Sequence, residues 1–273
     1  MCFVLISLKR NSKGVLAKAT GLRTRASSIY KPGQEEIFKV SRSKFNDFLT
    51  CQRCFYLDRV SGIVSPGTPG WTLNETTDLL LKKEFDACRT AGIPHRSFEQ
   101  YGLSNVVPFD HPEIDDWRNS LHKGIAFQIP ETNIILHGGV DDIWFDQNTH
   151  EIIIVDYKSQ ANRWDVTTES YLRNVYHQSY KVQMDVYAYI LKNMGYDVGS
   201  TSYFYVCNAN REAEGFFGIM EFKETLVPYN WDDSWIENSL NSMFAVLNDS
   251  EPPTSNESCE NCAYSMQRAA IGF

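Results

Sequence analysis

Two β-type segments joined by a short polar turn constrain the fold of this chain most strongly. Residues 133–145 and 151–158 are rich in β-branched and aromatic residues, and the residues between them, 146–150, are polar. This composition predicts a β-hairpin. Because side chains alternate across a strand, Asp156 and Lys158 should share one face with Ile152 and Ile154.

The predicted hairpin brings acidic side chains together. Asp141 on the first strand can approach Asp156 on the second. Two carboxylates at close range repel each other unless a cation lies between them, and Mg²⁺ is typically held by one or two carboxylates together with phosphate and water. Lys158 can orient an attacking water or stabilise charge in the transition state. Asp142 is expected to be a structural or rim residue, with the alternative that it takes the place of Asp141 if the register differs by one residue.

A helix is predicted over residues 177–195, where apolar residues recur at helical spacing and Gly195 provides a stop signal. Gln183 and Tyr187 are four residues apart and therefore share one face of this helix. Either side chain can contact a phosphate, a metal-bound water or a base. Each also has a simpler interpretation, in which Gln183 is a solvated helix residue and Tyr187 belongs to the core.

The order Gly-x-Val-Asp, Asp-x-Lys and Gln-x-x-x-Tyr resembles the RecB-like branch of the PD-(D/E)XK nuclease superfamily. The same order occurs in the CRISPR-adaptation exonucleases and in the nuclease domain of AddB-type helicase partners. The resemblance spans residues 38–268 and implies an α/β fold with a restriction-endonuclease-like α-β-β-β-α-β core and added helices. It also implies one or two Mg²⁺ or Mn²⁺ ions and cleavage of DNA.

The resemblance assigns roles to individual residues. Asp141 and Asp156 match the metal ligands, and Lys158 matches the catalytic lysine. Gln183 and Tyr187 match the helical motif.

A further ligand is implied on an earlier helix, which the sequence predicts over residues 73–90. Related nucleases usually place a histidine there, four residues after a glycine. In this chain Asn74 and Asp78 occupy those two places. The resemblance therefore points to Asp78 as a metal ligand in the place of the histidine.

The cysteines give a second, independent signal. Two Cys-x-x-Cys pairs, Cys51/Cys54 and Cys259/Cys262, lie far apart in the chain. Paired Cys-x-x-Cys is a typical metal-site spacing, because both thiolates of each pair can reach one centre. Disulfides are not expected, since nothing indicates secretion. We therefore expect one four-cysteine metal centre; the alternative is two unligated pairs.

The segments around both pairs are similar to the cysteine segments of iron–sulfur members of the same nuclease branch. Those members carry one cysteine near the start and three near the end, whereas this chain carries two and two. Four cysteines can hold either a four-iron, four-sulfur cluster or Zn²⁺. The sequence leaves both open.

Weaker patterns predict the remaining elements. Helices are expected over residues 43–58 and 231–247, and strands that can pair are expected over residues 200–207 and 215–222. Arginine and lysine near the first cysteines could form a phosphate-binding patch, or could equally be solvated helix charges. The candidates for this patch are Arg42, Lys44, Arg53 and Arg59.

Length and composition favour a single globular domain. The resemblance implies that this is a nuclease-like domain at residues 38–268, preceded by a basic, flexible extension at 1–37 and followed by a tail at 269–273. The charge is uneven. The first 60 residues carry twelve Lys/Arg and four Asp/Glu, and the remainder carries fourteen and thirty, which gives the net charge of −8. No apolar stretch reaches transmembrane length. We expect a cytoplasmic protein, with an organelle transit peptide in the basic N-terminus as the alternative.

Together these patterns predict a metal-dependent nuclease, and the resemblance implies an exonuclease that acts on DNA in repair, recombination or defence. The residues themselves leave DNA against RNA, and exonuclease against endonuclease, open. A helicase or another subunit of a repair or defence complex is the expected protein partner, and no membrane is involved. Two alternatives stay open. The protein could be a nucleic-acid-binding module with a degenerate metal site, or an accessory subunit that the cysteine centre stabilises.

Overall fold

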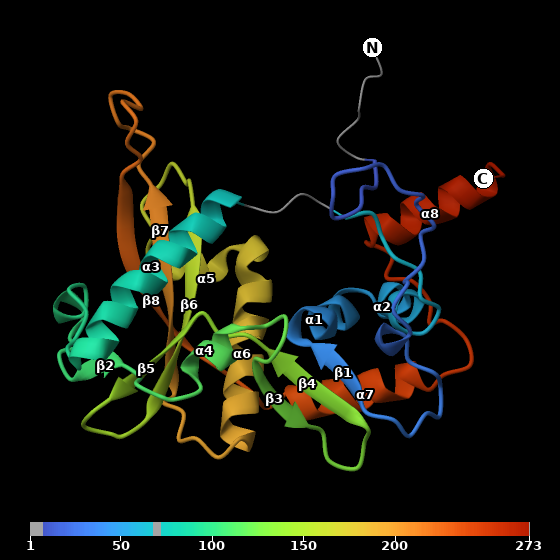
Figure 1. Ribbon diagram of the computed structural model, residues 1–273, viewed down its shortest axis with the longest axis horizontal. Coiled ribbons are helices and arrows are strands. Elements are labelled where there is room, and N and C mark those ends of the chain that lie inside the picture. The colour runs from blue at the N-terminus through green and yellow to red at the C-terminus, as the bar shows by residue number, and fades with distance from the viewer. Residues whose placement is uncertain (1–7, 68–71, 273) are drawn as a thin grey trace.

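The computed structural model describes residues 8–67 and 72–272 (Figure 1). Its strands are β1 (Phe38–Ser41), β2 (Val106–Pro108), β3 (Ile125–Gln128), β4 (Ile134–Gly138), β5 (Asp142–Asp146), β6 (Ile152–Gln160), β7 (Thr201–Ala209) and β8 (Phe222–Asn230). Its helices are α1 (Arg42–Thr50), α2 (Gln52–Arg59), α3 (Thr72–Ala91), α4 (Ile114–Arg118), α5 (Thr168–Arg173), α6 (Gln178–Asn193), α7 (Ile236–Leu247) and α8 (Glu260–Ala270). Short 3-10 turns lie at Ala26–Ser28, Glu99–Tyr101 and Val175–His177.

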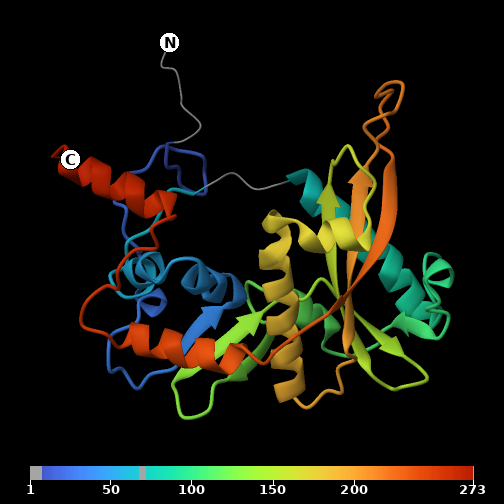
Figure 2. The same cartoon turned by 180° about the vertical axis from the view of Figure 1, so that it is seen from behind.

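The larger sheet has the strand order β2-β5-β6-β7-β8, and within it only β6 and β7 are parallel. Helix α3 covers one face and α6 lies against the other (Figures 1 and 2). Strand β6 is therefore buried on both faces, which explains its nearly continuous apolar run. Ile154 packs into the core on the α6 side, and Val155 packs into the core on the α3 side. The predicted alternation of this strand is confirmed.

The smaller sheet has the order β1-β4-β3, with β1 parallel and β3 antiparallel to β4. Helix α6 contacts both sheets, and residues 183–191 of this helix are all buried. A helix that is buried on most sides must carry apolar residues beyond a single stripe. The mixed sheets and helices confirm the α/β class and agree with a restriction-endonuclease-like fold.

The predicted first strand of the hairpin is broken by two glycines. A Cβ on Gly138 would lie 2.6 Å from Cε1 of the Tyr187 ring. A Cβ on Gly139 would lie 2.6 Å from the Cβ of Ser120 and 2.9 Å from its backbone. The chain turns where it passes these neighbours, so β4 and β5 enter different sheets. Asp141 lies at this corner, immediately before β5, and only β5 forms the hairpin with β6.

Three other expected elements also differ from the structure. The helix over 43–58 divides at Cys51, which has extended backbone (φ −156°) between α1 and α2. The prediction of a strand over 215–222 is wrong, because these residues form the tip of the β7–β8 hairpin and β8 begins only at Phe222. The helix over 231–247 begins at Ile236, after a turn held by hydrogen bonds to Asp185.

Part of the predicted N-terminal extension contacts the domain. Arg23 forms an ion pair with Asp58, and Tyr30 is 1% exposed and donates a 3.1 Å hydrogen bond to Asn248 Oδ1. The packed structure thus includes residues before 38. Residues 1–7 of the extension and residue 273 of the tail lie outside the described residues.

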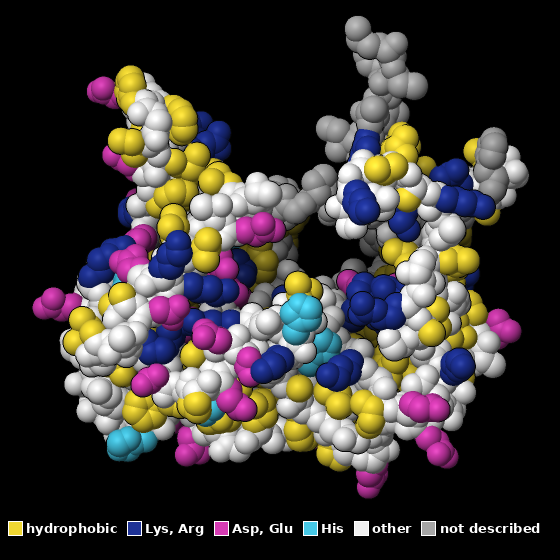
Figure 3. All heavy atoms as spheres, viewed as in Figure 1, with side chains coloured by type: hydrophobic (Ala, Val, Ile, Leu, Met, Phe, Trp, Pro, Cys, Tyr) yellow, Lys and Arg dark blue, Asp and Glu magenta, His cyan; other side chains and the backbone are white. Residues whose placement is uncertain are grey.

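Two arms rise from the body of the molecule. One carries the tip of the β7–β8 hairpin and the other carries α8, and the surface between them is hollowed (Figures 1 and 3). Basic side chains lie on either side of the floor of this hollow, and hydrophobic side chains cover the hairpin tip (Figure 3). Two of these, Phe216 and Phe217, are 70% and 84% exposed. Within the described ranges, no helix combines the length and apolar character that crossing a membrane requires.

Candidate active site and cysteine centre

A pocket of about 350 Å³ opens where α1, α3 and α6 approach the C-terminal part of β6. It collects acidic, basic and amide side chains from segments distant in sequence. The lining residues are Arg42, Asn74, Asp78, Asp141, Tyr157, Lys158, Ser159, Ser179, Tyr180 and Gln183. Four residues that the sequence predicted for the site, Asp78, Asp141, Lys158 and Gln183, therefore meet in one pocket.

Asp156 lies beneath this pocket and is fully buried. It forms an ion pair with Lys158, and Gln183 Nε2 donates a 2.7 Å hydrogen bond to its Oδ1 atom. The same amide nitrogen lies 3.1 Å from the hydroxyl of Tyr187, which donates a 2.6 Å hydrogen bond to the Gly139 carbonyl. The helical pair thus contacts both the strand acid and the glycine corner. Gln183 is only 7% exposed, so its interpretation as a solvated residue is wrong.

The other two acids reach the pocket from different elements. Asp141 Oδ2 accepts a 2.9 Å hydrogen bond from the backbone N–H of Tyr157. Asp78, on α3, accepts a 2.9 Å hydrogen bond from Lys82 through Oδ2. Its Oδ1 atom is buried without a hydrogen-bond partner among the described residues. A buried carboxylate oxygen of this kind is available to a cation.

Burial and repulsion from a neighbouring carboxylate raise the pKa values of Asp156 and Asp78. Burial raises the pKa of Asp156 to about 7; Lys158 opposes this shift and the neighbouring Asp141 adds to it. Burial, and then the charge of Asp141, raise the pKa of Asp78. Burial alone would lower the pKa of Lys158, but Asp156 and Asp141 outweigh it and raise that pKa. Three acids therefore gather at a pocket that two cationic side chains, Arg42 and Lys158, line.

These donors fit a divalent ion such as Mg²⁺ or Mn²⁺. Hard cations take carboxylate oxygens, and Mg²⁺ usually keeps several waters beside one or two carboxylates. Among residues 8–67 and 72–272, only the cysteine group places three or more ligand atoms within 4.8 Å of one another. At least one pair among the three carboxylates is therefore spaced more widely than that. An ion held by two of them and completed by water and phosphate oxygens fits this spacing.

Sequence analysis placed neither Arg42 nor Tyr180 at the predicted metal site; Arg42 was named only as a candidate for the basic patch near the first cysteines. Arg42 is the first residue of α1, and its Nε atom is buried without a hydrogen-bond partner among the described residues. Tyr180 places its ring 4.7 Å from Lys158 Nζ, in a cation–π contact. Tyr180 lies three residues before Gln183 on α6, so helical spacing could have identified it. No comparable signal exists for Arg42, whose position depends on packing between distant elements.

The basic patch suggested near the first cysteines does not form as a unit. Lys44 and Arg59 both form ion pairs with Asp58. Arg53 donates a 3.1 Å hydrogen bond to the carbonyl of Pro253. Of the four candidates, only Arg42 lines the pocket.

Asp142 has a structural role on the face of β5 that packs towards α3, away from the pocket. It is fully buried and forms ion pairs with Arg89 and Arg118. The hydroxyl of Tyr157 donates a 2.8 Å hydrogen bond to its Oδ2 atom. Asp142 is therefore satisfied within the core on the α3 side. This confirms the structural interpretation, at a buried position rather than at a rim.

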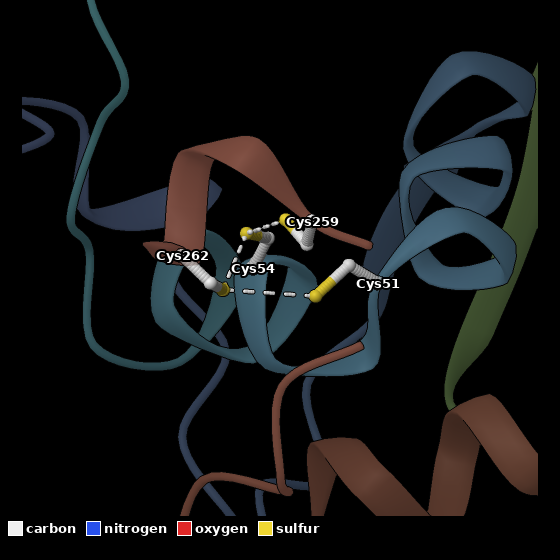
Figure 4. Close-up of side chains that lie close together, drawn as sticks. All are labelled: Cys51, Cys54, Cys259 and Cys262. Atoms are coloured by element: carbon white, nitrogen blue, oxygen red, sulfur yellow. Dashed lines mark hydrogen bonds between the residues drawn. The ribbon is translucent and has the colours of Figure 1, made fainter. Parts of the chain in front are cut away.

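The four paired cysteines converge at a second site, between α2 and α8 (Figure 4). Cys54 Sγ lies 3.3 Å from Cys262 Sγ and 3.5 Å from Cys259 Sγ, and Cys51 Sγ lies 3.8 Å from Cys262 Sγ. Cys51 and Cys259 directly precede α2 and α8, so the first turn of each helix brings the second cysteine back beside the first. Residues near 50 and near 260 are thereby joined.

The thiols at this site affect one another's ionisation. Burial raises the pKa of Cys51, but hydrogen bonds from the backbone of Asn256 and Cys54 outweigh it and lower that pKa to about 7. Burial and the neighbouring sulfurs raise the pKa of Cys262. One thiolate forms readily and further thiolates repel it. A bound cation removes this repulsion, because metal ions take the deprotonated sulfur.

Comparison with known proteins places the chain in a family. Residues 96–267, more than half of the chain, match the family model described as the PD-(D/E)XK nuclease superfamily. Among solved structures, a candidate exonuclease from Eubacterium rectale is 14% identical, with 85% of this chain and 93% of that chain covered and a TM-score of 0.39. A protein named SSO0001 is 10% identical, with 85% of each chain covered and a TM-score of 0.33. No curated protein matches the chain.

Proposed function

The chain belongs to the PD-(D/E)XK nuclease superfamily, and from this premise we propose that it is a Mg²⁺- or Mn²⁺-dependent nuclease that hydrolyses phosphodiester bonds in DNA. One observation carries the proposal. Asp141 and Lys158 line the same pocket, Asp156 lies directly beneath it, and Gln183 holds Asp156 through a hydrogen bond.

The carboxylates would hold the metal ion in this proposal. Asp141 and Asp156 would be its principal ligands, and Asp78 would be the third, through the carboxylate oxygen that has no hydrogen-bond partner among the described residues. When bound, a divalent ion polarises a phosphate oxygen and lowers the pKa of a bound water.

The remaining residues act on the phosphate, the attacking water or the ligands themselves. Lys158 stabilises negative charge as the phosphodiester bond breaks, or orients the attacking water. Gln183 is a positioning residue, because it fixes the carboxylate of Asp156. Tyr187 is also a positioning residue, since its hydroxyl holds the Gly139 carbonyl at the corner that precedes Asp141.

Arg42 is the proposed phosphate-binding residue. It and Lys158 are the two cationic side chains that line the pocket. Lys158 is already paired with Asp156, whereas the Nε atom of Arg42 has no partner among the described residues. Guanidinium groups match the geometry of phosphate oxygens and bind them through paired hydrogen bonds. Arg42 would therefore hold the substrate beside the metal.

We further propose that the protein belongs to the RecB-like branch, acts as an exonuclease in repair, recombination or defence, and works with a helicase or another complex subunit. The support is the motif order from Asp141 to Tyr187 and the pair of Cys-x-x-Cys segments. The described structure adds a hollow between its two arms, where a nucleic-acid strand would lie in this proposal (Figure 3).

A second candidate function is nucleic-acid binding without cleavage, as an accessory subunit. It is favoured by the direct ion pair between Lys158 and Asp156, which places an ammonium group against a proposed metal ligand. It is also favoured by the spacing of the carboxylates, which do not meet as closely as the cysteines do.

The deciding experiment is cleavage of labelled single- and double-stranded DNA and RNA by the purified chain, with Mg²⁺, with Mn²⁺ or with EDTA. Cleavage that EDTA abolishes and that Asp156→Asn reduces by about a thousand-fold or more supports the nuclease. The matched control is Asp115→Asn, at an exposed acid outside the pocket, which should cleave normally. Tight binding without cleavage under any condition would favour the accessory subunit instead.

A further inference from the structure

We infer that Cys51, Cys54, Cys259 and Cys262 hold a single zinc ion, and not the four-iron, four-sulfur cluster that the family resemblance implies. This deepens the expectation of a cysteine metal centre. It does not depend on catalysis at the pocket, because the metal content can be measured without substrate.

The spacing of the sulfur atoms is the first argument. In a tetrahedral zinc site each Zn–S bond is about 2.3 Å, so the sulfurs lie about 3.8 Å apart. The closest sulfur–sulfur distances here are 3.3, 3.5 and 3.8 Å, and all four sulfurs lie within 4.8 Å of one another. In a cubane cluster each thiolate binds a different iron atom on the outside of the cluster. Such sulfurs are separated by the body of the cluster as well as by two Fe–S bonds, which the observed spacing does not accommodate.

The arrangement of the cysteines in the fold is the second argument. Each pair begins at the residue before a helix, Cys51 before α2 and Cys259 before α8, and each helix supplies two sulfurs from one turn. Two Cys-x-x-Cys pairs that face each other are typical of structural zinc sites. The iron–sulfur members that the sequence resembles instead divide their cysteines as one and three. This chain has two cysteines near each end instead. Its cysteine pattern and its sulfur spacing therefore both differ from those of a cluster site.

The surroundings of the sulfurs are the third argument. Cys51 and Cys262 are 3% and 6% exposed, and Cys54 and Cys259 are partly buried. Asn261 Nδ2 donates a 3.4 Å hydrogen bond to Cys54 Sγ, and Asn256 Nδ2 donates a 3.1 Å hydrogen bond to the Thr50 carbonyl beside Cys51. Hydrogen bonds of this kind orient metal ligands. With four thiolates and no open position, the ion would be structural, and its binding would release the protons of the thiols.

The test is the metal content of the full chain, purified anaerobically from cells grown with both iron and zinc. We expect a colourless protein with about one zinc per chain and no acid-labile sulfide. Exchange for Co²⁺ should give the intense visible bands of a tetrahedral cobalt–thiolate centre. A brown protein with about four irons and matching sulfide per chain would overturn the inference, and so would a soluble chain that contains neither metal.

Variants separate the centre from general folding. Cys259→Ser should lose most of the zinc, whereas Cys88→Ser, at a cysteine outside the group, should keep it. If Cys259→Ser is insoluble, Cys259→His provides the measurement, because zinc accepts three cysteines and one histidine. That variant should retain zinc, and zinc-free Cys259→His in soluble form would count against the inference. Absence of nuclease activity would change none of these readings, so the two proposals can fail separately.

Discussion

The side-chain amide of Gln183 donates a 2.7 Å hydrogen bond to Oδ1 of Asp156, and thereby joins α6 to the central strand of the larger sheet. The bond determines which carboxylate oxygen remains for other partners. Oδ2 is left to form the ion pair with Lys158. A residue 27 positions away along the chain thus orients the acid that the proposed metal requires.

The first prediction concerns this hydrogen bond. Gln183→Ala should lower kcat by about ten-fold or more, with a smaller change in KM, because a hydrogen bond to a charged group contributes about 1.5–3 kcal/mol. Steady-state cleavage at saturating metal measures the effect. Gln100→Ala, at an exposed glutamine, is the control and should behave as the native chain. An equal loss of kcat in both variants would remove the positioning role.

The second prediction concerns pH. Burial raises the pKa of Asp156 to about 7 in the folded chain, from 3.8 in the unfolded chain. Between these values the metal-free folded chain binds a proton that the unfolded chain has released, so its stability should fall as pH rises from about 4 to about 7. A metal ion needs the charged carboxylate, so stabilisation by Mg²⁺ should be larger at pH 8 than at pH 6. Thermal unfolding with and without Mg²⁺ measures both trends. Asp156→Asn should remove them, and trends that persist in this variant would assign them to another group.

The third prediction concerns substrate binding. Arg42→Gln should raise KM by about ten-fold, because a charge-assisted hydrogen bond to phosphate is lost, while kcat changes less. Arg42→Lys should recover part of the affinity, since it keeps the charge but not the paired geometry. Arg173→Gln, at an arginine whose side chain is 80% exposed, is the matched control. If KM is unchanged in Arg42→Gln, phosphate is bound elsewhere.

The fourth prediction concerns the glycine corner. Gly139→Ala should destabilise the fold by about 1–3 kcal/mol, because the added Cβ meets the backbone of Ser120 and overpacks the corner. Denaturant unfolding measures the loss. Gly67→Ala is the control, since its Cβ meets no atom of the described residues within 4 Å. If both variants are equally stable, the corner accommodates a side chain and the glycine is not required there.

The elements that the sequence predicted correctly are those whose structure depends on residues close together in the chain. The alternation of β6 and the helical spacing of α6 depend on residues close in sequence, and both elements appear where the sequence places them. The Asp-x-Lys motif and the Gln183/Tyr187 pair therefore reach the pocket region as a consequence of two well-defined elements. The convergence of the cysteine pairs also followed from their spacing, since metal-site geometry is recorded in the sequence.

The remainder depends on contacts that no local pattern records. The break at Gly138 and Gly139 arises from the close approach of Tyr187 and Ser120, residues from other parts of the chain. Residues 215–222 have the alternation of a strand. The β7–β8 pairing ends at Ala209 and Phe222, so within the described structure the residues before Phe222 form the exposed tip of the hairpin. Likewise, nothing near Arg42 in the sequence indicates that α1 begins inside the pocket.

Helix α1 begins with Arg42 in the pocket and ends one residue before Cys51 in the cysteine centre. Its nine residues make a rigid strut of about 13 Å between the two sites. The strut is anchored at one end by the sulfur ligands and carries a guanidinium group at the other. Loss of the metal ion would release the end of α1 next to Cys51. The resulting movement of the helix would displace Arg42 at its other end. Metal occupancy of the cysteine centre, which contacts no substrate, would then govern how tightly the pocket binds its substrate.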